Sequence, residues 1–292
     1  MASITRRALL RSGLLAGVAA LAGCRGSETP SAVTTPTPTP TTTPLPSVFE
    51  DIGTEGNALV VRLVDDHTVS RLNLIAPDGT LFGSATIPTG ATTARIEILD
   101  IEWGLASYDH YEPGQYTLVT VPESDADPVS VPVDLVPELR ILDISQYRDG
   151  EWTADLAQIV VRIENVGTGP TWVSDFTYQD APNWTVNNDY LRGPGLPSFA
   201  EPSNLDDILL PPGGQQTYVE GIGPLLFTSN DWDSCDIERD MTVIVGTAVG
   251  EPLEQTVRIK AGGEQTSVGL VNDFVCSRVA ISPQPENAET GL

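Results

Sequence analysis

Lysine, cysteine and histidine are scarce in this 292-residue chain. Lys260 is the only lysine, and there are three cysteines and two histidines, His67 and His110. So few nitrogen and sulfur ligands do not make a standard four-ligand zinc site. Basic residues are also few, 15 against 40 acidic ones, for a net charge of −25. Such a charge repels phosphate backbones and anionic lipid faces, and therefore argues against nucleic acid as a partner.

Helical periodicity and catalytic signatures are lacking as well. No stretch longer than about ten residues places apolar side chains at helical spacing. No Gly-x-Ser-x-Gly, His-Glu-x-x-His or phosphate-binding loop occurs. His110 follows Asp109, but adjacent residues of a strand or loop point apart and do not form a triad. The sequence therefore predicts no enzyme and no bound cofactor.

The first 24 residues have the order of an export signal. Arg6 and Arg7 precede an apolar run from Leu14 to Ala22, far shorter than the roughly 20 residues of a spanning helix. The segment Thr5–Leu10 resembles a twin-arginine signal. Leu21-Ala22-Gly23-Cys24 resembles the lipobox of prokaryotic lipoproteins, which implies that Cys24 becomes the lipid-modified first residue of the mature chain. The alternative is an ordinary signal with an unrelated cysteine.

A stalk follows the signal, and the mature chain is more acidic still. Residues 24–48 are predicted to be disordered, because Thr29–Pro46 is almost only Thr, Pro, Ser, Ala and Val, and proline removes backbone donors. Loss of residues 1–23 lowers the count of basic residues from 15 to 12 and takes the net charge to −28. Molar salt, with a Debye length of about 3 Å, screens the resulting self-repulsion. The composition resembles that of haloarchaeal proteins.

The remainder reads as short strands separated by turns, which predicts an all-β chain with two immunoglobulin-like β-sandwich domains. We expect the first domain at 49–136, the second at 137–282 with an insertion at 179–209, and a flexible tail at 283–292. The turn at Pro113-Gly114 followed by Tyr116 is typical of the tyrosine corner of such sandwiches. The expected strands are Ala58–Val64, Val69–Ala76, Thr80–Ile87, Ala94–Ile101, Gln115–Val121, Val129–Leu135, Met241–Val249 and Leu253–Ile259.

Two motifs of the second domain carry a family resemblance. One is the run from Val161 to Pro170, which follows the pattern V-x-V-x-N-x-G with Ile163 in place of the second valine, and the other is Leu210-Pro211-Pro212-Gly213. Together they resemble CARDB modules, the immunoglobulin-like domains of prokaryotic surface proteins, over roughly residues 137–260. The resemblance implies a sandwich that displays or adheres, without catalysis. The matching positions are turn and core residues: Ile163, Asn165, Gly167, Gly169, Leu210, Pro212 and Gly213.

Cysteine pairing and the insertion supply the other site predictions. Cys235 and Cys276 are an even pair in an exported chain, so we expect a disulfide; two buried free thiols are the alternative. In the insertion, Trp184, Tyr190 and Arg192 are candidate binding residues, since Trp, Tyr and Arg anchor recognition surfaces. The alternative is that Trp184 and Tyr190 fold back and cap the sandwich.

Two weaker candidates complete the set. Asn183-Trp184-Thr185 is a glycosylation sequon. Asp231, Asp233 and Asp236 could offer hard oxygens to calcium, although their spacing is not that of an EF-hand and no metal is predicted.

The sequence thus predicts a protein anchored by lipid to the extracellular face of the cell membrane. Its expected role is non-catalytic: display, adhesion or interaction with a cell-envelope protein or glycan. A solute- or glycan-binding lipoprotein is the first alternative, and an extracellular hydrolase the second.

Overall fold

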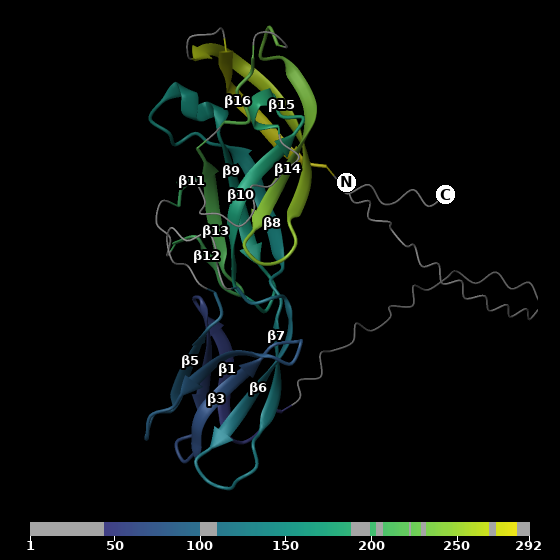
Figure 1. Cartoon of the computed structure of the whole chain (residues 1–292). Coiled ribbons are helices and arrows are strands. Elements are labelled where there is room, and N and C mark those ends of the chain that lie inside the picture. The colour runs from purple at the N-terminus through teal and green to yellow at the C-terminus, as the bar shows by residue number, and fades with distance from the viewer. Residues whose placement is uncertain are drawn as a thin grey trace, which may run out of the picture. The chain divides into compact units, whose positions relative to one another are not determined.

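The protein is built from strands and turns. The structure, a computed structural model, describes residues 44–99, 110–187, 199–202, 207–221, 223–228, 232–268 and 273–284. In these residues the regular elements are sixteen β-strands and two short 3₁₀ turns, with no α-helix (Figure 1). No helix among them is long and apolar enough to cross a membrane. The predicted all-β fold class is confirmed.

The first seven strands form two antiparallel sheets, which we call the first β-module. The sheet of order β1-β2-β5 contains β1 (Phe49–Glu55), β2 (Ala58–Leu63) and β5 (Thr93–Glu97). The sheet of order β4-β3-β6-β7 contains β3 (Val69–Ile75), β4 (Leu81–Thr86), β6 (Gly114–Pro122) and β7 (Ser130–Leu135).

The other nine strands form the second β-module. One sheet, of order β11-β13-β9-β8, contains β8 (Leu139–Gln146), β9 (Ile159–Asn165), β11 (Phe199–Glu201) and β13 (Gln215–Glu220). The facing sheet, of order β12-β10-β14-β15-β16, contains β10 (Thr171–Gln179), β12 (Leu209–Leu210), β14 (Ile237–Thr247), β15 (Leu253–Val268) and β16 (Asp273–Pro283). The two 3₁₀ turns are η1 (Thr153–Ala157) and η2 (Trp184–Val186).

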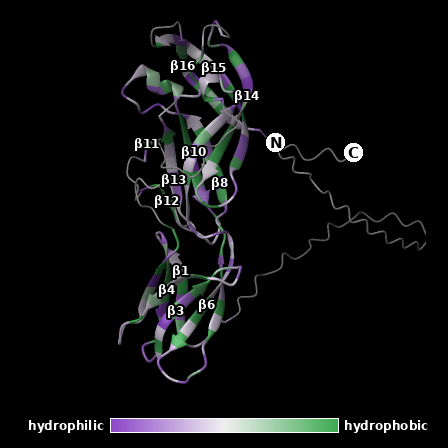
Figure 2. Ribbon diagram, in the orientation of Figure 1, coloured by the Kyte–Doolittle hydropathy of each residue, from purple (hydrophilic) through white to green (hydrophobic). Residues whose placement is uncertain are grey.

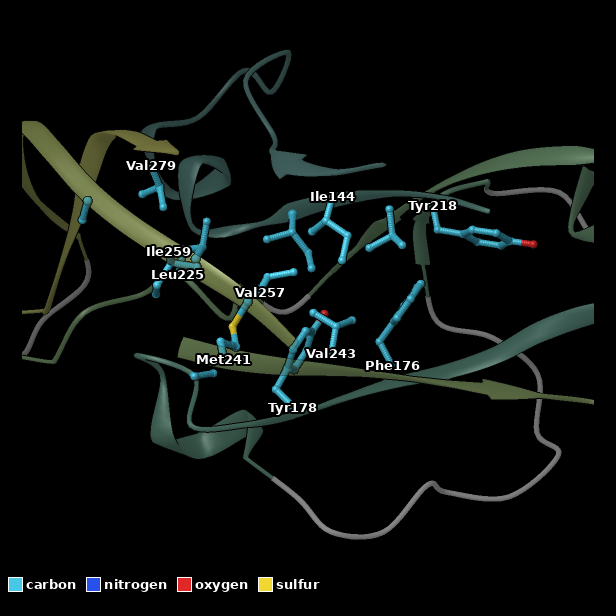
Figure 3. Close-up of a cluster of buried hydrophobic side chains, with 14 of the residues drawn as sticks. Ile144, Phe176, Tyr178, Tyr218, Leu225, Met241, Val243, Val257, Ile259 and Val279 are labelled. Carbon is cyan, nitrogen blue, oxygen red and sulfur yellow. The ribbon is translucent and has the colours of Figure 1, made fainter. Parts of the chain in front are cut away.

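Each module closes over its own hydrophobic core. Alternation places every second side chain inward, as in β6, where Tyr116, Leu118 and Thr120 are buried and their neighbours are not. Hydrophobic residues accordingly recur along the strands of both modules (Figure 2). The second core joins residues from both of its sheets, among them Ile144, Phe176, Tyr218 and Val243 (Figure 3). Burial of apolar side chains from two facing sheets is what stabilises a sandwich.

The first core includes residues from beyond the predicted domain boundary near Pro137. Trp172, Ile208 and Val249 belong to the second module by sequence, yet they are buried in the cluster of the first. The buried Tyr111 hydroxyl also donates to the Pro170 carbonyl at 2.7 Å. Residues from Pro44 onward form one compact unit, so the division into two domains near Pro137 stays a prediction.

A tyrosine corner opens β6, as the sequence predicted. The Tyr116 hydroxyl donates to the Glu112 carbonyl at 3.1 Å and accepts from the Glu112 N–H at 3.0 Å. The ring is buried and packs edge-on against Phe82. This geometry is typical of immunoglobulin-like sandwiches, in which the tyrosine bonds back to the preceding turn.

Asn165 joins three segments of the second module. Its buried amide donates to the carbonyls of Gly169 and Leu210 and accepts from the N–H groups of Glu138 and Gly167. Gly167 must be glycine, because a Cβ there would lie 2.3 Å from the Val136 carbonyl oxygen. The two motifs singled out in the sequence therefore meet at one buried side chain.

Several predicted boundaries are wrong. Val48 packs against the first core, so the predicted stalk ends earlier, and β1 follows where no strand was expected. β15 continues past Ile259 to Val268 because it pairs with β16, a strand that the sequence did not reveal. Pro283 and Gln284 belong to this sheet rather than to the tail, since the Gln284 N–H donates to Thr256.

Candidate recognition surface on two turns of the second module

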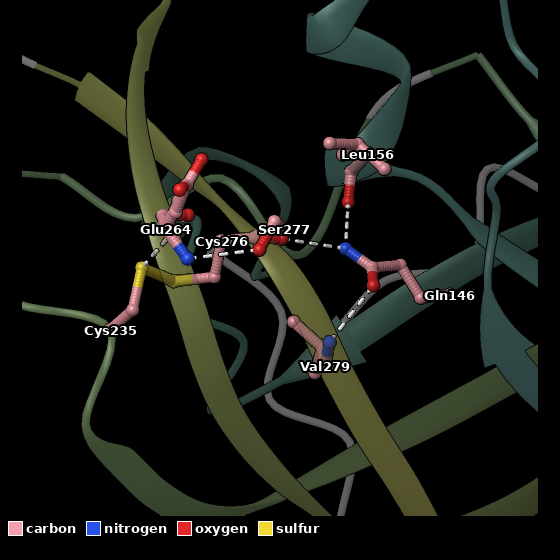
Figure 4. Close-up of a disulfide and its surroundings, with 7 residues drawn as sticks. All are labelled: Gln146, Leu156, Cys235, Glu264, Cys276, Ser277 and Val279. Carbon is pink, nitrogen blue, oxygen red and sulfur yellow. Dashed lines mark hydrogen bonds between the residues drawn. A yellow bond between two sulfur atoms is a disulfide. The ribbon is translucent and has the colours of Figure 1, made fainter.

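A disulfide ties the start of β14 to β16. Cys235 and Cys276 are bonded, with their Cα atoms 5.7 Å apart, which confirms the predicted pairing (Figure 4). Cys276 is fully buried and pairs in register with Gln265 of β15. The bond therefore crosses β15 and fixes the loop before β14 to the far strand of the sheet.

Gln146 fixes the turn η1 to the same strand. Its buried Nε2 donates to the Leu156 carbonyl at 2.9 Å and to the Cys276 carbonyl at 3.0 Å (Figure 4). Its Oε1 accepts from the Val279 N–H at 2.9 Å. A buried amide with all these partners holds β8, η1 and β16 in one arrangement.

The turn η1 presents Trp152 to solvent. The Trp152 N–H donates to the Asp155 carboxylate at 2.9 Å, and the Asp155 N–H donates to the Trp152 carbonyl at 2.9 Å. Both backbone groups of Trp152 are thus bonded, while its side chain makes no capping bond and the residue is 74% exposed. The backbone is fixed and the indole is left at the surface.

The turn η2 presents Trp184 in a similar way. Asn183 caps it: its Oδ1 accepts from the Thr185 N–H at 3.1 Å and from the Thr185 hydroxyl at 2.6 Å. The Trp184 carbonyl accepts from the Asn187 N–H, and Trp184 is 63% exposed. Trp184 therefore does not fold back over the sandwich, and the alternative prediction that it caps the sandwich is wrong.

A short segment joins the two turns. The Leu225 N–H donates to the Ala157 carbonyl at 2.8 Å, at the end of η1. Asn183 Nδ2 donates to the Gly223 carbonyl at 2.9 Å, and the Asn183 N–H donates to Pro224 at 3.1 Å. Residues 223–225 thus hold the bases of both turns at the same end of the second module.

No protein-family model and no curated protein sequence matches this chain. Among solved structures, the chain is similar to a structure titled "Biofilm associated protein - BSP domain", with 15% identity and a TM-score of 0.23; the match covers 70% of this chain and 27% of the other. It is also similar to a protein of unknown function from Porphyromonas gingivalis W83, with 19% identity and a TM-score of 0.21, covering 68% and 88% of the two chains. Structural similarity this weak does not indicate a function for this chain.

Of the remaining predicted site residues, the structure describes Asp233, Asp236 and Asn183. Asp233 and Asp236 are exposed and Asp231 lies outside the described residues, within which no group of three or more His, Cys, Asp or Glu side chains could hold a metal. Tyr190 and Arg192 lie outside the described residues, as do Arg6, Arg7 and Cys24. Asn183 is only 4% exposed. Its Nδ2, the atom that would carry a glycan, donates a hydrogen bond to the Gly223 carbonyl.

Trp232 contrasts with the two exposed tryptophans. The Arg239 guanidinium carbon lies 5.2 Å from the centre of the Trp232 ring, and Arg239 also approaches Asp180 at 3.7 Å. The ring packs edge-on against Phe227 in the core. Trp232 is therefore partnered within the chain by a cation and by an aromatic ring.

A polar depression lies on the solvent-facing side of β9 and β13. Its volume is about 600 Å³, and its lining is charged or amide-bearing for the most part. The lining residues are Arg162, Glu201, Pro202, Asp207, Gln215, Gln216 and Thr217.

Trp152 is the surface residue that sequence reasoning missed. Asp149-Gly150-Glu151 marks a turn, and Asp155 three residues after Trp152 is the spacing of a capping box. These signals predict a short helical turn with Trp152 at its cap. That its ring faces solvent follows only from the packing of Gln146 and Leu225 behind the turn.

Proposed function

We propose that this protein is a lipid-anchored surface protein that displays its β-modules for non-catalytic adhesion or envelope interaction. One observation carries the proposal: the disulfide uses Cys235 and Cys276, and Cys24 is the third of only three cysteines in the chain. The one remaining thiol therefore lies in the lipobox-like segment. A buried disulfide also fits an exported protein, because oxidising compartments preserve such bonds.

The order of segments supports outward display. A twin-arginine-like signal, a lipid-accepting cysteine and a proline-rich stalk precede the first strand at Phe49. Two acyl chains anchor a protein stably where one does not. A stalk of this composition holds its cargo at a distance from the membrane, at about 3.1 Å per extended residue.

Growth in concentrated salt is part of the proposal. The few cations of the chain are shared among several acids: Arg62 contacts both Asp51 and Glu55, and Arg258 contacts both Asp240 and Glu238. All of these side chains are solvent-exposed. Exposed ion pairs contribute little free energy, so they do not offset the self-repulsion of a chain with net charge −25. Screening by concentrated salt would reduce this self-repulsion.

The CARDB resemblance of the second module remains a proposal as well. Its motif residues Asn165, Gly167, Gly169 and Leu210 meet through hydrogen bonds in one buried turn cluster. They are structural positions, which agrees with a display module whose specificity lies elsewhere on its surface.

Replacing the anchoring residue tests the proposal. Cys24→Ser should release the mature protein from membranes into the medium, still folded, because the acyl chains are lost. Fractionation and immunoblotting of cells grown in the native salt would measure this, with Ser27→Ala as a control that should stay membrane-bound. A Cys24→Ser protein that remains on the membrane after its signal is cleaved would overturn the anchor.

A further inference from the structure

We propose that Trp152 and Trp184 form a binding platform for a neutral glycan chain. The proposal rests on the proposed surface function and gives it a ligand class. These two residues are the most exposed large hydrophobic side chains of the described structure, at 74% and 63%. Each indole offers a large apolar face with a polar N–H at its edge, which suits a ligand that is itself partly apolar and partly polar.

Both rings are presented by backbone that is already ordered. Trp152 is fixed through Asp155, and the turn behind it through Gln146 and Leu225. Trp184 is fixed through the Asn183 cap and the Asn187 N–H. Because little backbone entropy remains to be lost, ligand binding would pay a smaller ordering cost than on a flexible loop.

The two turns are joined in a way that would suit an extended ligand. Ala157 and Asn183 both bond to residues 223–225, so the two rings stand on neighbouring turns at one end of the second module. Two flat apolar surfaces so arranged would contact successive sugar rings of one chain.

Charge does not supply the ligand contact. At molar salt the net charge of −25 is largely screened, so a charged ligand gains little from it and a neutral one loses nothing. The exposed neighbours of Trp184, Thr185 and Asn187, are uncharged, and Trp152 lies between the exposed Glu151 and Thr153. The nearest acid before η2, Asp180, lies against Arg239. Hydroxyl and amide groups beside an aromatic face can bond sugar hydroxyls while the apolar face of the pyranose packs on the indole.

Salt also favours this kind of contact. At the molar salt of the proposed habitat the Debye length is about 3 Å, so charge pairs between surfaces are largely screened. Apolar contacts are not screened, and excluded salts strengthen them. A surface protein under these conditions retains aromatic stacking as a means of recognition, and the two exposed rings supply it.

The test uses the full-length protein in about 2 M salt, where charge is screened. It is applied to an array of neutral hexose oligosaccharides, with sulfated and uronate oligosaccharides as a separate arm. We expect retention on neutral chains, and no stronger retention on the anionic ones. Titration with the oligosaccharide that is retained should then change tryptophan fluorescence. Trp152→Ala and Trp184→Ala should each weaken binding at least about tenfold, as for residues that anchor an interface.

Matched variants separate stacking from folding. Trp184→Phe keeps an aromatic face and should retain most of the affinity. Leu81→Ala removes another exposed apolar side chain, 59% exposed and in the first module, and should leave binding unchanged. Circular dichroism of each variant checks that it is folded.

Three results would overturn the inference: no retention of any neutral oligosaccharide, stronger retention of the anionic ones, or unchanged binding by the double variant Trp152→Ala/Trp184→Ala. None of them affects the anchor, which Cys24→Ser tests separately. A protein that is released by Cys24→Ser but binds no sugar would leave the surface function standing without this ligand.

Discussion

At the scale of single residues, the buried side chain of Asn165 joins several segments of the fold. Its side chain has four hydrogen bonds, its backbone bonds to Gly213 and Gly214, and it is fully buried. It thereby joins the start of β8, the turn after β9 and the segment around β12. A side chain with this many partners specifies one arrangement of those turns, because any other leaves buried groups without bonds.

Asn165→Ala should therefore lower the free energy of unfolding by at least about 3 kcal/mol, since several buried backbone groups lose their partner. Chemical denaturation in high salt measures the loss. The matched control is Asn73→Ala, at a partly buried position of β3. It should lower the free energy of unfolding by about 1 kcal/mol or less. Equal losses in the two variants would contradict the role assigned to Asn165.

Buried tyrosines predict sensitivity to alkali. The pKa of Tyr178 is raised well above its ordinary value by burial and by the Glu220 carboxylate. This carboxylate accepts a hydrogen bond from the Tyr178 hydroxyl. Burial likewise raises the pKa of Tyr111 and of Tyr218. The folded state thus keeps protons that the unfolded chain releases above about pH 10.

The stability supplied by these neutral hydroxyls is complete below about pH 10 and is lost as the pH rises above it, by up to about 1.4 kcal/mol per pH unit for each tyrosine. Denaturation midpoints from pH 8 to 12 should show this fall. Tyr218→Phe removes a single hydroxyl, which donates to the Ile208 carbonyl, and should make the fall shallower. An unchanged slope in that variant would contradict the assignment.

At the scale of elements, the β15–β16 hairpin and its disulfide organise one end of the second module. The bond closes a separation of 41 residues and fixes the loop that precedes β14. Gln146 then bonds the same strand to η1, so the hairpin positions the turn that bears Trp152. Sequence periodicity predicted β14 and the first part of β15, but not β16, since its inward residues are interrupted by the exposed Ser277 and Arg278.

Reduction of the disulfide should lower the free energy of unfolding by about 4 kcal/mol in the chain-entropy model for a loop of this length. Urea denaturation with and without a reductant measures the effect. The Cys235→Ala/Cys276→Ala variant should show a similar loss and no further response to reductant. If the oxidised and reduced proteins unfold at the same urea concentration, the disulfide does not stabilise the fold.

At the scale of the whole molecule, the two modules share contacts that no local pattern predicts. Trp172 is buried in the first core although it opens β10 of the second module, and Tyr111 donates to Pro170 across the same junction. Gly169 leaves room for this bond, because a Cβ there would lie 2.3 Å from the Tyr111 hydroxyl oxygen. The glycine that the motif singled out is thus required by a residue almost sixty positions earlier.

The charge of the whole chain sets its expected response to salt. With a net charge of −25, the folded state should lose stability as the salt concentration falls from about 2 M to about 50 mM, where the Debye length exceeds 10 Å. Circular dichroism and thermal melts at both concentrations measure this. Sodium sulfate and potassium chloride at matched ionic strength distinguish screening from salting-out. An identical melting temperature at both concentrations would contradict adaptation to salt.

Local chemistry and composition are enough to predict the class of this fold and some of its contacts. Alternating apolar residues and Pro-Gly turns predicted the all-β class and the corner at Tyr116, and cysteine parity predicted the disulfide. The export signal, the lipid anchor and the stalk also follow from the sequence and remain predictions. Only the tertiary structure decided that Asn183 is buried, that Trp184 faces solvent, and that Trp152 joins it at one end of the second module. Those outcomes depend on Gln146, Gly223 and Leu225 packing behind the turns, and contacts between residues so far apart in the chain leave no periodic trace in the sequence.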